Sequence, residues 1–254
     1  MIPVNALALQ IFEAFSAGRE IAPAPGLTER SLTLAEAYEV EAELQRLRIA
    51  EGRRVVGRKV GYANRAMWRV LKLETLVWAS MYDDTVVMTD GEAEWSPRGH
   101  SLRIEPEIVM KLKVPVTRHA EAAAVLEAAE WIALGFEIID CPYPDWKFTP
   151  ADFVAAFGLH RRLFVGAPQT EVQGLEEALA GFRLKLCRNG ELVEEGAGKN
   201  SLKSPALCVA EMGAVAGEII STGTLTAAQP ILAGETWRAE ADILPVEPIT
   251  LRLL

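Results

Sequence analysis

Apolar residues in the first part of the chain recur with helical spacing, and capping signals mark where helices begin and end. The chain opens with an amphipathic helix, which the Pro- and Gly-containing stretch at 22–26 closes. Thr33 and Glu36 have the spacing of a capping box for a second helix, which we expect to run to about Ala50. The buried stripe of this second helix is predicted to consist of Ala37, Val40, Leu44 and Leu47.

From Arg53 onward the pattern changes to short strands separated by turn residues. Asn189 and Gly190 give the strongest turn signal, because Asn-Gly favours the tight turn of a two-residue β-hairpin. Short helices are expected after Asn64 and after Thr149, since both are good N-cap residues. The predicted strands lie within residues 55–61, 85–95, 103–112, 135–140, 182–196, 217–226 and 235–242.

The order of the elements indicates the fold class. We expect one further helix, Ala-rich and capped by Thr117, to run to about Leu134, directly before the buried strand at 135–140. Helices in front of mixed strands are typical of an α+β fold with a mostly β core, and not of alternating βαβ units. The predicted organisation is an N-terminal helical region at 1–52 followed by a mixed β domain at 53–254.

The strand at 103–112 carries two glutamates on one face. Strand alternation places Glu105 and Glu107 on the same side, roughly 7 Å apart along the chain. Two carboxylates at this spacing repel each other unless solvent or a cation lies between them. Pro106 between them predicts a sheet edge or a bulge, because proline donates no ladder hydrogen bond. The ordinary alternative is a solvated strand face.

A third glutamate strengthens the case for a cation. Glu137 lies in an apolar strand, where a lone carboxylate is costly to bury without a partner. Together with Glu105 and Glu107 it forms a candidate all-oxygen site, which selects Mg²⁺, Mn²⁺ or Ca²⁺ over zinc or copper. Few ligands plus water favour Mg²⁺, which leaves room for a chelating substrate. The alternative is that Glu137 pairs with an arginine or lysine.

Lys59 is a candidate proton donor or carboxylate anchor. It lies in a strand between Gly57 and Gly61, and glycines in a strand indicate close approach of backbone or ligand. A desolvated lysine can serve either role. The alternative is an ordinary exposed strand lysine.

Further polar candidates lie in two loops. The segment at 221–225 places hydroxyl groups around a glycine at a strand end, which can present donors to an anion, although a simple turn is the more frequent case. Lys147, beside Trp146, is a second candidate catalytic lysine. His160 is more often expected to be a structural histidine than a base.

Composition and charge exclude several classes of function. The chain has 254 residues, half of them hydrophobic, which is enough for one large domain. It has no apolar run long enough to span a membrane, and its N-terminus lacks the basic start of a signal peptide. A net charge of −9 argues against nucleic acids and anionic membranes as partners. Three scattered cysteines without a CxxC motif indicate a reduced, cytoplasmic setting.

Seven motifs in order resemble a known family. They are GRKVG, YDD, RIEPEI, GFEIID with DWK, FGLH, RNGELVEEGAG and GEIISTGTLTAAQPI. Over roughly residues 50–254 the chain resembles the fumarylacetoacetate hydrolase superfamily, and within it the branch of 2-keto-4-pentenoate hydratases and 4-oxalocrotonate decarboxylases. The resemblance implies a distorted mixed β-roll with flanking helices and a small 2-oxo acid as substrate. We also expect a homo-oligomer.

The resemblance also implies roles for individual residues. Mg²⁺ or Mn²⁺ is expected on the residues that match the family's carboxylates, which are Glu105, Glu107 and Glu137. The matching catalytic lysine is Lys59, and the matching acid is Asp83, with Asp84 beside it. The substrate loop matches Thr222, Gly223 and Thr224.

The implied chemistry stabilises an enolate when a cation chelates the carboxylate and keto oxygens of a 2-oxo acid. Our first hypothesis is a 2-hydroxypenta-2,4-dienoate hydratase of aromatic-compound meta-cleavage catabolism. The alternatives are a 2-oxo-3-hexenedioate decarboxylase, an acylpyruvate-type C–C hydrolase and a non-catalytic assembly subunit. The hydrolase requires a water-activating base, usually a His–Glu pair, that the sequence does not identify. The start GRKVGYAN and the motifs around residues 77–84 and 157–160 differ from the usual hydratase forms, which bears on the substrate and not on the metal.

Overall fold

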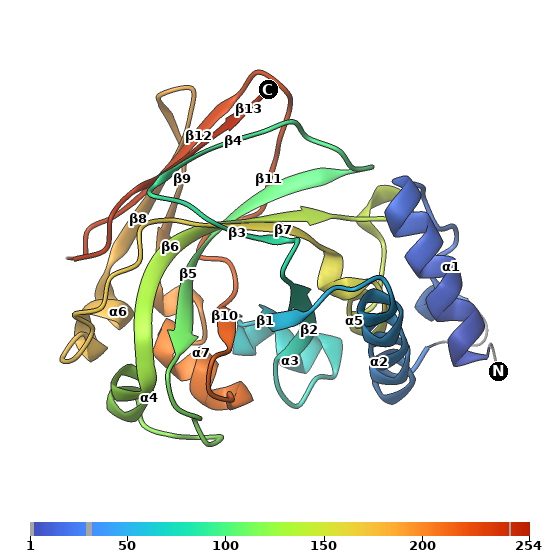
Figure 1. Cartoon of the computed structure of the whole chain (residues 1–254), viewed down its shortest axis with the longest axis horizontal. Coiled ribbons are helices and arrows are strands. Elements are labelled where there is room, and N and C mark those ends of the chain that lie inside the picture. The colour runs from blue at the N-terminus through green and yellow to red at the C-terminus, as the bar shows by residue number, and fades with distance from the viewer. Residues whose placement is uncertain (1–2, 29–31, 244) are drawn as a thin grey trace.

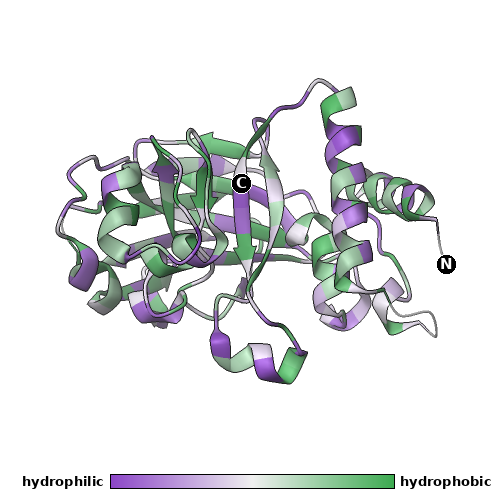
Figure 2. Ribbon diagram, turned by 90° about the horizontal axis from the view of Figure 1, so that it is seen from below, coloured by the Kyte–Doolittle hydropathy of each residue, from purple (hydrophilic) through white to green (hydrophobic). Residues whose placement is uncertain are grey.

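The computed structural model describes residues 3–28, 32–243 and 245–254. The described residues form two β-sheets, and the N-terminal helices lie to one side of them (Figure 1). Figure 2 shows mainly hydrophobic residues on the central strands, whereas the helices carry both hydrophobic and hydrophilic residues. The predicted α+β fold with a mixed β-roll core is confirmed.

The larger sheet has the order β2-β1-β10-β5-β6-β7-β3, and β11 also pairs with β5. Its strands are mixed, because β1 and β10 run parallel while β5 runs antiparallel to β6. The strands β5 and β6 are long and curved, and they pass through the middle of the molecule (Figure 1). The strands are β1 (Val55–Gly61), β2 (Val77–Tyr82), β3 (Val86–Met88), β5 (Leu102–Leu112), β6 (Ala129–Asp140), β7 (His160–Val165), β10 (Ile219–Ser221) and β11 (Gln229–Pro230).

The smaller sheet has the order β4-β13-β12-β8-β9. The predicted hairpin is confirmed between β8 and β9, where Asn189 and Gly190 both have positive φ angles, of 53° and 85°. Its strands are β4 (Glu92–Trp95), β8 (Arg183–Arg188), β9 (Glu191–Ala197), β12 (Thr236–Ala241) and β13 (Ile249–Leu253).

The helices begin at the predicted caps in several places. Thr33 and Thr149 each form a capping box, and the Asn64 side chain caps a third helix. Among the described residues, no helix combines the length and apolar character needed to cross a membrane. The helices are α1 (Val4–Ala17), α2 (Leu34–Ala50), α3 (Arg65–Leu71), α4 (Ala122–Ala128), α5 (Pro150–Ala155), α6 (Glu176–Gly181) and α7 (Pro205–Met212). Single 3₁₀ turns cover Pro25–Leu27, Pro144–Trp146, Phe157–Leu159 and Gly198–Asn200.

A buried cluster joins the N-terminal helices to the rest of the chain. It contains residues of α1, α2 and α5 together with Tyr82 and Tyr143. The helices α1 and α2 therefore pack against α5. The division of the chain at residue 52 stays a prediction.

The helix predicted from Thr117 to Leu134 is wrong at both ends. It begins after Glu121 and ends at Ala128, and the chain continues directly as β6. Ala-rich sequence favours a helix locally, but Trp131 and the apolar residues after it pair with β5 and are buried. Tertiary pairing therefore overrides local propensity here.

The prediction that Pro106 marks an edge or a bulge is also wrong. Pro106 lies inside the sheet, opposite Phe136 of β6. Its carbonyl accepts a hydrogen bond from the backbone of Leu225, in the loop between β10 and β11. The proline nitrogen faces this same side, where regular pairing is interrupted, so its missing N–H leaves no ladder partner unsatisfied.

Candidate active site

Three glutamates meet at the centre of the larger sheet because of the register between β5 and β6. Glu105 lies directly opposite Glu137, and Glu107 follows on the same face of β5. One carboxylate oxygen of each glutamate lies within 4.8 Å of those of the other two. Glu107 and Glu137 are fully buried, which excludes a solvated strand face.

The environment of Glu107 tests whether these residues fit a metal ion. Its Oε2 accepts hydrogen bonds from the Ser221 hydroxyl and, at 2.8 Å, from the backbone N–H of Gly223. Its Oε1 is buried and has no hydrogen-bond partner among the described residues. Burial and repulsion by Glu137 and Glu105 raise the pKa of Glu107 well above its ordinary value. An oriented oxygen without a partner, beside two other carboxylates, fits a hard divalent cation such as Mg²⁺ or Mn²⁺.

Lys59 of β1 lies against this cluster and is only 2% exposed. Its Nζ lies 2.9 Å from Oε2 of Glu137, donates a hydrogen bond to the carbonyl of Gly158 at 3.0 Å, and lies 4.8 Å from the ring centre of Phe153. Burial lowers the pKa of Lys59, but Glu137 and the two neighbouring glutamates outweigh burial, so the pKa is raised. Lys59 is therefore a buried cation, and the ordinary exposed lysine is excluded. Glu137 both pairs with a lysine and belongs to the glutamate cluster.

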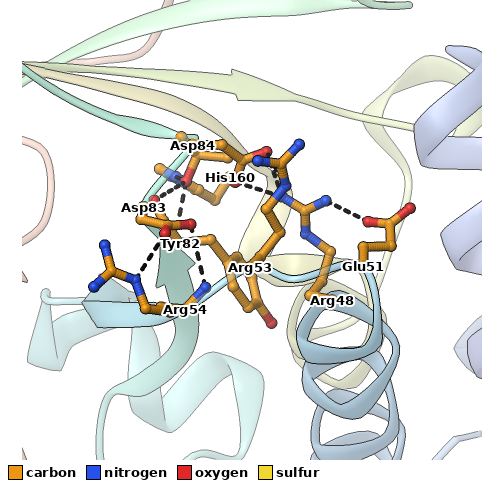
Figure 3. Close-up of polar contacts among 9 residues, drawn as sticks. Arg48, Glu51, Arg53, Arg54, Tyr82, Asp83, Asp84 and His160 are labelled. Atoms are coloured by element: carbon orange, nitrogen blue, oxygen red, sulfur yellow. Dashed lines mark hydrogen bonds and ion pairs between the residues drawn. The ribbon is translucent and has the colours of Figure 1, made fainter.

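His160 of β7 holds the other oxygen of Glu137. Its Nδ1 lies 2.8 Å from Oε1 of Glu137, and its Nε2 lies 3.0 Å from the Thr85 hydroxyl. Burial alone raises the pKa of Glu137, but Lys59 and His160 outweigh burial and hold that pKa below its ordinary value. His160 thus orients a candidate metal ligand, as the partners of metal-binding side chains commonly do. Figure 3 shows His160 beside the turn that follows Tyr82.

A cavity of about 870 Å³ opens in front of the glutamates and Lys59. Glu105 and Lys59 line one part of it, and aromatic side chains line another part. Two of these aromatic residues, Tyr62 and Trp146, have left-handed backbones with φ angles of 57° and 56°. Such strain in non-glycine residues is concentrated at functional sites. The aromatic lining residues are Tyr62, Trp146, Phe148 and Phe153.

The predicted Thr-Gly-Thr loop reaches the site in part. Gly223 and Thr224 line the cavity, and the Gly223 N–H orients Glu107. Thr222 is fully buried and donates its hydroxyl to the carbonyl of Ile108, so it fastens the loop to β5. A substrate-binding role for Thr224 stays a prediction.

Two predicted catalytic residues do not line the cavity. The side chain of Lys147 is 73% exposed and pairs with Asp145 at 3.1 Å, although Trp146 and Phe148 on either side of it line the cavity. Asp83 accepts hydrogen bonds from the backbone and side chain of Arg54, within the arginine-rich network that Figure 3 shows. Asp84 pairs with Arg48 in the same network. The catalytic roles of Lys147 and Asp83 therefore stay predictions, without a place on the cavity wall to support them.

Comparison with known proteins adds close relatives, although no family model matches the chain. A 4-oxalocrotonate decarboxylase of Pseudomonas sp. (strain CF600) is 31% identical over 214 residues, which cover 80% of each chain. A 2-hydroxyhexa-2,4-dienoate hydratase of Comamonas testosteroni is 31% identical over 245 residues, which cover 89% of each chain. A 2-keto-4-pentenoate hydratase of Paraburkholderia xenovorans is 29% identical over 230 residues, covering 86% of this chain and 83% of the relative.

Solved structures agree with these relatives. The 4-oxalocrotonate decarboxylase from Pseudomonas putida G7, complexed with magnesium and adipate, has a TM-score of 0.86 and 27% identity, covering 99% of this chain and 97% of the other. A fumarylpyruvate hydrolase from Pseudomonas aeruginosa has a TM-score of 0.54 at 13% identity, covering 78% of this chain and 88% of the other. At 13% identity, the similarity to the fumarylpyruvate hydrolase shows only that the two proteins share a fold.

The fold and the three-glutamate site thus define the class of fumarylacetoacetate hydrolase-like proteins. Within that class, the chain belongs to the family of 2-keto-4-pentenoate hydratases and 4-oxalocrotonate decarboxylases.

Proposed function

We propose that the protein is a divalent-metal-dependent lyase of a 2-oxo acid or its dienol, with hydration of 2-hydroxypenta-2,4-dienoate as the first candidate reaction. The observation that carries this proposal is the buried cluster of three glutamates beside Lys59 at a cavity. Glu105, Glu107 and Glu137 would hold Mg²⁺ or Mn²⁺, and the ion would supply positive charge to stabilise enolate character in the substrate. The magnesium complex of the Pseudomonas putida decarboxylase supports the choice of metal.

The chain's own residues provide a hydrogen-bond donor beside the cavity. In the metal-free protein the glutamates raise the pKa of Lys59, and its ammonium group at the cavity can serve as a hydrogen-bond donor towards the substrate. Its Nζ is held in place by Glu137 and the carbonyl of Gly158. Aromatic side chains line the cavity beside polar ones, so the site offers both apolar contact and charged groups to a substrate.

The second candidate reaction is decarboxylation of 2-oxo-3-hexenedioate. A specific observation favours it, because Arg103 lines the cavity and provides a positive charge for a second carboxylate of the substrate. In both reactions the same site stabilises the enolate, and the difference is whether water adds or carbon dioxide leaves.

A C–C hydrolase and a non-catalytic subunit have less support. The hydrolase requires a His–Glu pair that activates water at the substrate. The structure does contain such a pair, but His160 is buried with both ring nitrogens engaged, and it does not line the cavity. A non-catalytic subunit would not explain why Glu107 keeps a buried carboxylate oxygen without a hydrogen-bond partner in the same cluster as the buried Lys59.

Turnover assays distinguish the candidates. The protein is incubated with 2-hydroxypenta-2,4-dienoate and separately with 2-oxo-3-hexenedioate, each with Mg²⁺ and with EDTA, and absorbance is followed. The first candidate reaction predicts metal-dependent turnover of the first compound, and the charge of Arg103 predicts turnover of the second. If only the second compound is turned over in a metal-dependent way, the reaction is decarboxylation and not hydration. If neither compound is turned over, the proposal is contradicted.

We further propose a cytoplasmic homo-oligomer that binds neither nucleic acid nor membranes. The three cysteines Cys141, Cys187 and Cys208 are free thiols, which supports a reducing compartment. The net charge of −9 disfavours polyanionic partners.

A further inference from the structure

Arg103 is a positive charge on the cavity wall that forms no ion pair with the glutamate cluster among the described residues. It lies two residues before Glu105 on β5, so both side chains leave the same face of the strand. The other cation that lines the cavity, Lys59, is paired with Glu137. Among the described residues, none of the carboxylates forms an ion pair with Arg103, although Glu194 and Glu195 also line the cavity.

The guanidinium group of Arg103 is held by stacking. Its central carbon lies 3.9 Å from the ring centre of Trp146. The Trp146 ring is fixed in turn, because its Nε1 donates a 2.8 Å hydrogen bond to the Ser101 hydroxyl. Stacking occupies one face of the guanidinium and leaves its N–H edges free, and these edges make no hydrogen bond within the described part of the chain. A planar group with free paired donors matches a carboxylate with two parallel hydrogen bonds.

The position of Arg103 relative to the glutamates sets the length of a ligand. A 2-oxo acid bound at the glutamates has its reacting end near Glu105, and Arg103 lies roughly 7 Å further along the strand. We propose that Arg103 binds the distal carboxylate of a dicarboxylic 2-oxo acid and so selects such substrates over monocarboxylic ones. This inference rests on the proposed function, because it requires the 2-oxo acid end to bind at the glutamates. It favours the second candidate reaction, because 2-oxo-3-hexenedioate carries a distal carboxylate and 2-hydroxypenta-2,4-dienoate does not.

A matched pair of ligands tests this role by binding alone. 2-Oxoadipate and 2-oxohexanoate share the 2-oxo acid end and the chain length, and they differ in the distal carboxylate. Each is titrated calorimetrically into the native protein in the presence of Mg²⁺. We expect 2-oxoadipate to bind about tenfold more tightly or better, as a charge-assisted hydrogen-bonded pair provides.

Three variants locate the selectivity. Arg103→Met removes the charge and the donors, so the affinity ratio of the two ligands should fall to about one. Arg103→Lys keeps the charge without the paired donors and should give an intermediate ratio. Arg65→Met is the matched control, because Arg65 lies beside the neighbouring cavity and pairs with Glu211, and it should keep the native ratio.

The outcomes separate this inference from the proposed function. A native ratio that survives both Arg103 variants overturns the role of Arg103. Equal weakening of both ligands in Arg103→Met also overturns it, because Arg103 then holds the end that the ligands share. If the native protein binds the two ligands equally well, the inference fails and the proposed function stands. If it binds neither ligand with Mg²⁺, both fail.

Discussion

The charge balance of the glutamate cluster predicts opposite behaviour for two similar substitutions in the metal-free protein. Glu137→Gln removes the carboxylate that lies between Lys59 and His160, at 2.9 Å and 2.8 Å. Glu107→Gln removes a carboxylate whose pKa is raised by burial and by the neighbouring glutamates. The first change therefore removes a stabilising charge, and the second removes a charge that the metal-free protein does not favour.

The magnitudes follow from burial. Breaking a buried ion pair by removing one partner costs about 3–5 kcal/mol, because the other charge is left uncompensated. Glu105 and Glu107 still interact favourably with the charge of Lys59 after the substitution. We therefore expect Glu137→Gln to lower the free energy of unfolding by the lower end of this range, about 3 kcal/mol. Gln at position 107 keeps an oxygen that accepts from Ser221, and we expect a change within about 1 kcal/mol or a slight gain.

Urea denaturation in the presence of EDTA measures both changes. With a urea slope of about 1–3 kcal/mol per molar, Glu137→Gln should lower the midpoint by roughly 1 M or more, while Glu107→Gln leaves it nearly unchanged. The double variant Lys59→Met with Glu137→Gln is the control, because it also removes the uncompensated charge and should recover part of the loss. Equal midpoints for the two single variants, or a double variant that is the sum of its parts, would refute the reasoning.

Two further predictions concern a glycine and a helix cap. Gly158→Ala introduces a Cβ 2.8 Å from Cδ of Lys59, so kcat/KM should fall about 10–100-fold. Gly18→Ala is the control, because Gly18 has the same φ of 60° but nothing within 4 Å of an added Cβ, and this variant should keep native activity. An equal loss of activity in both variants contradicts the role of the contact with Lys59. Hydrogen bonds from Thr33 hold the pKa of Glu36 below its ordinary value, so their stabilisation is present near neutral pH and is lost as the pH falls through that lowered pKa. Thr33→Ala should therefore lower the melting temperature at pH 7 and should differ less from the native protein in acid, as measured by thermal melting, and a difference that does not change with pH refutes the assignment.

Local patterns predict the parts of the site that depend on one segment. Glu105 and Glu107 share a face because strand alternation is a property of the strand itself. The apolar neighbours of Glu137 predict its burial, and the glycines around Lys59 indicate a close approach. At Gly57 the approach is the backbone of β10, because a Cβ there would lie 1.8 Å from the carbonyl oxygen of Ile219, and at Gly61 it is the ring of Phe153.

Contacts between distant segments cannot be predicted in the same way. The contact between His160 and Glu137 depends on the register of β7 against β6, which carries an irregularity at this point. Lys147 follows a turn in which Asp145 has a φ of 54°, and no local pattern shows that its side chain leaves the cavity that its neighbours line. The catalytic role predicted for Asp83 rests on a resemblance alone, and its ion pair with Arg54 is visible only in the folded chain.

The central claim is that Glu105, Glu107 and Glu137 bind one divalent cation. The most direct test is calorimetric titration of Mn²⁺ or Mg²⁺ into EDTA-treated and dialysed protein, native and Glu107→Gln, because this variant is expected to fold normally. We predict one bound ion for each native chain and severely weakened binding in the variant, since a hard cation with few protein ligands depends on each of them. Equal binding by both proteins would remove Glu107 from the site, and no binding by the native protein would contradict the metal centre itself.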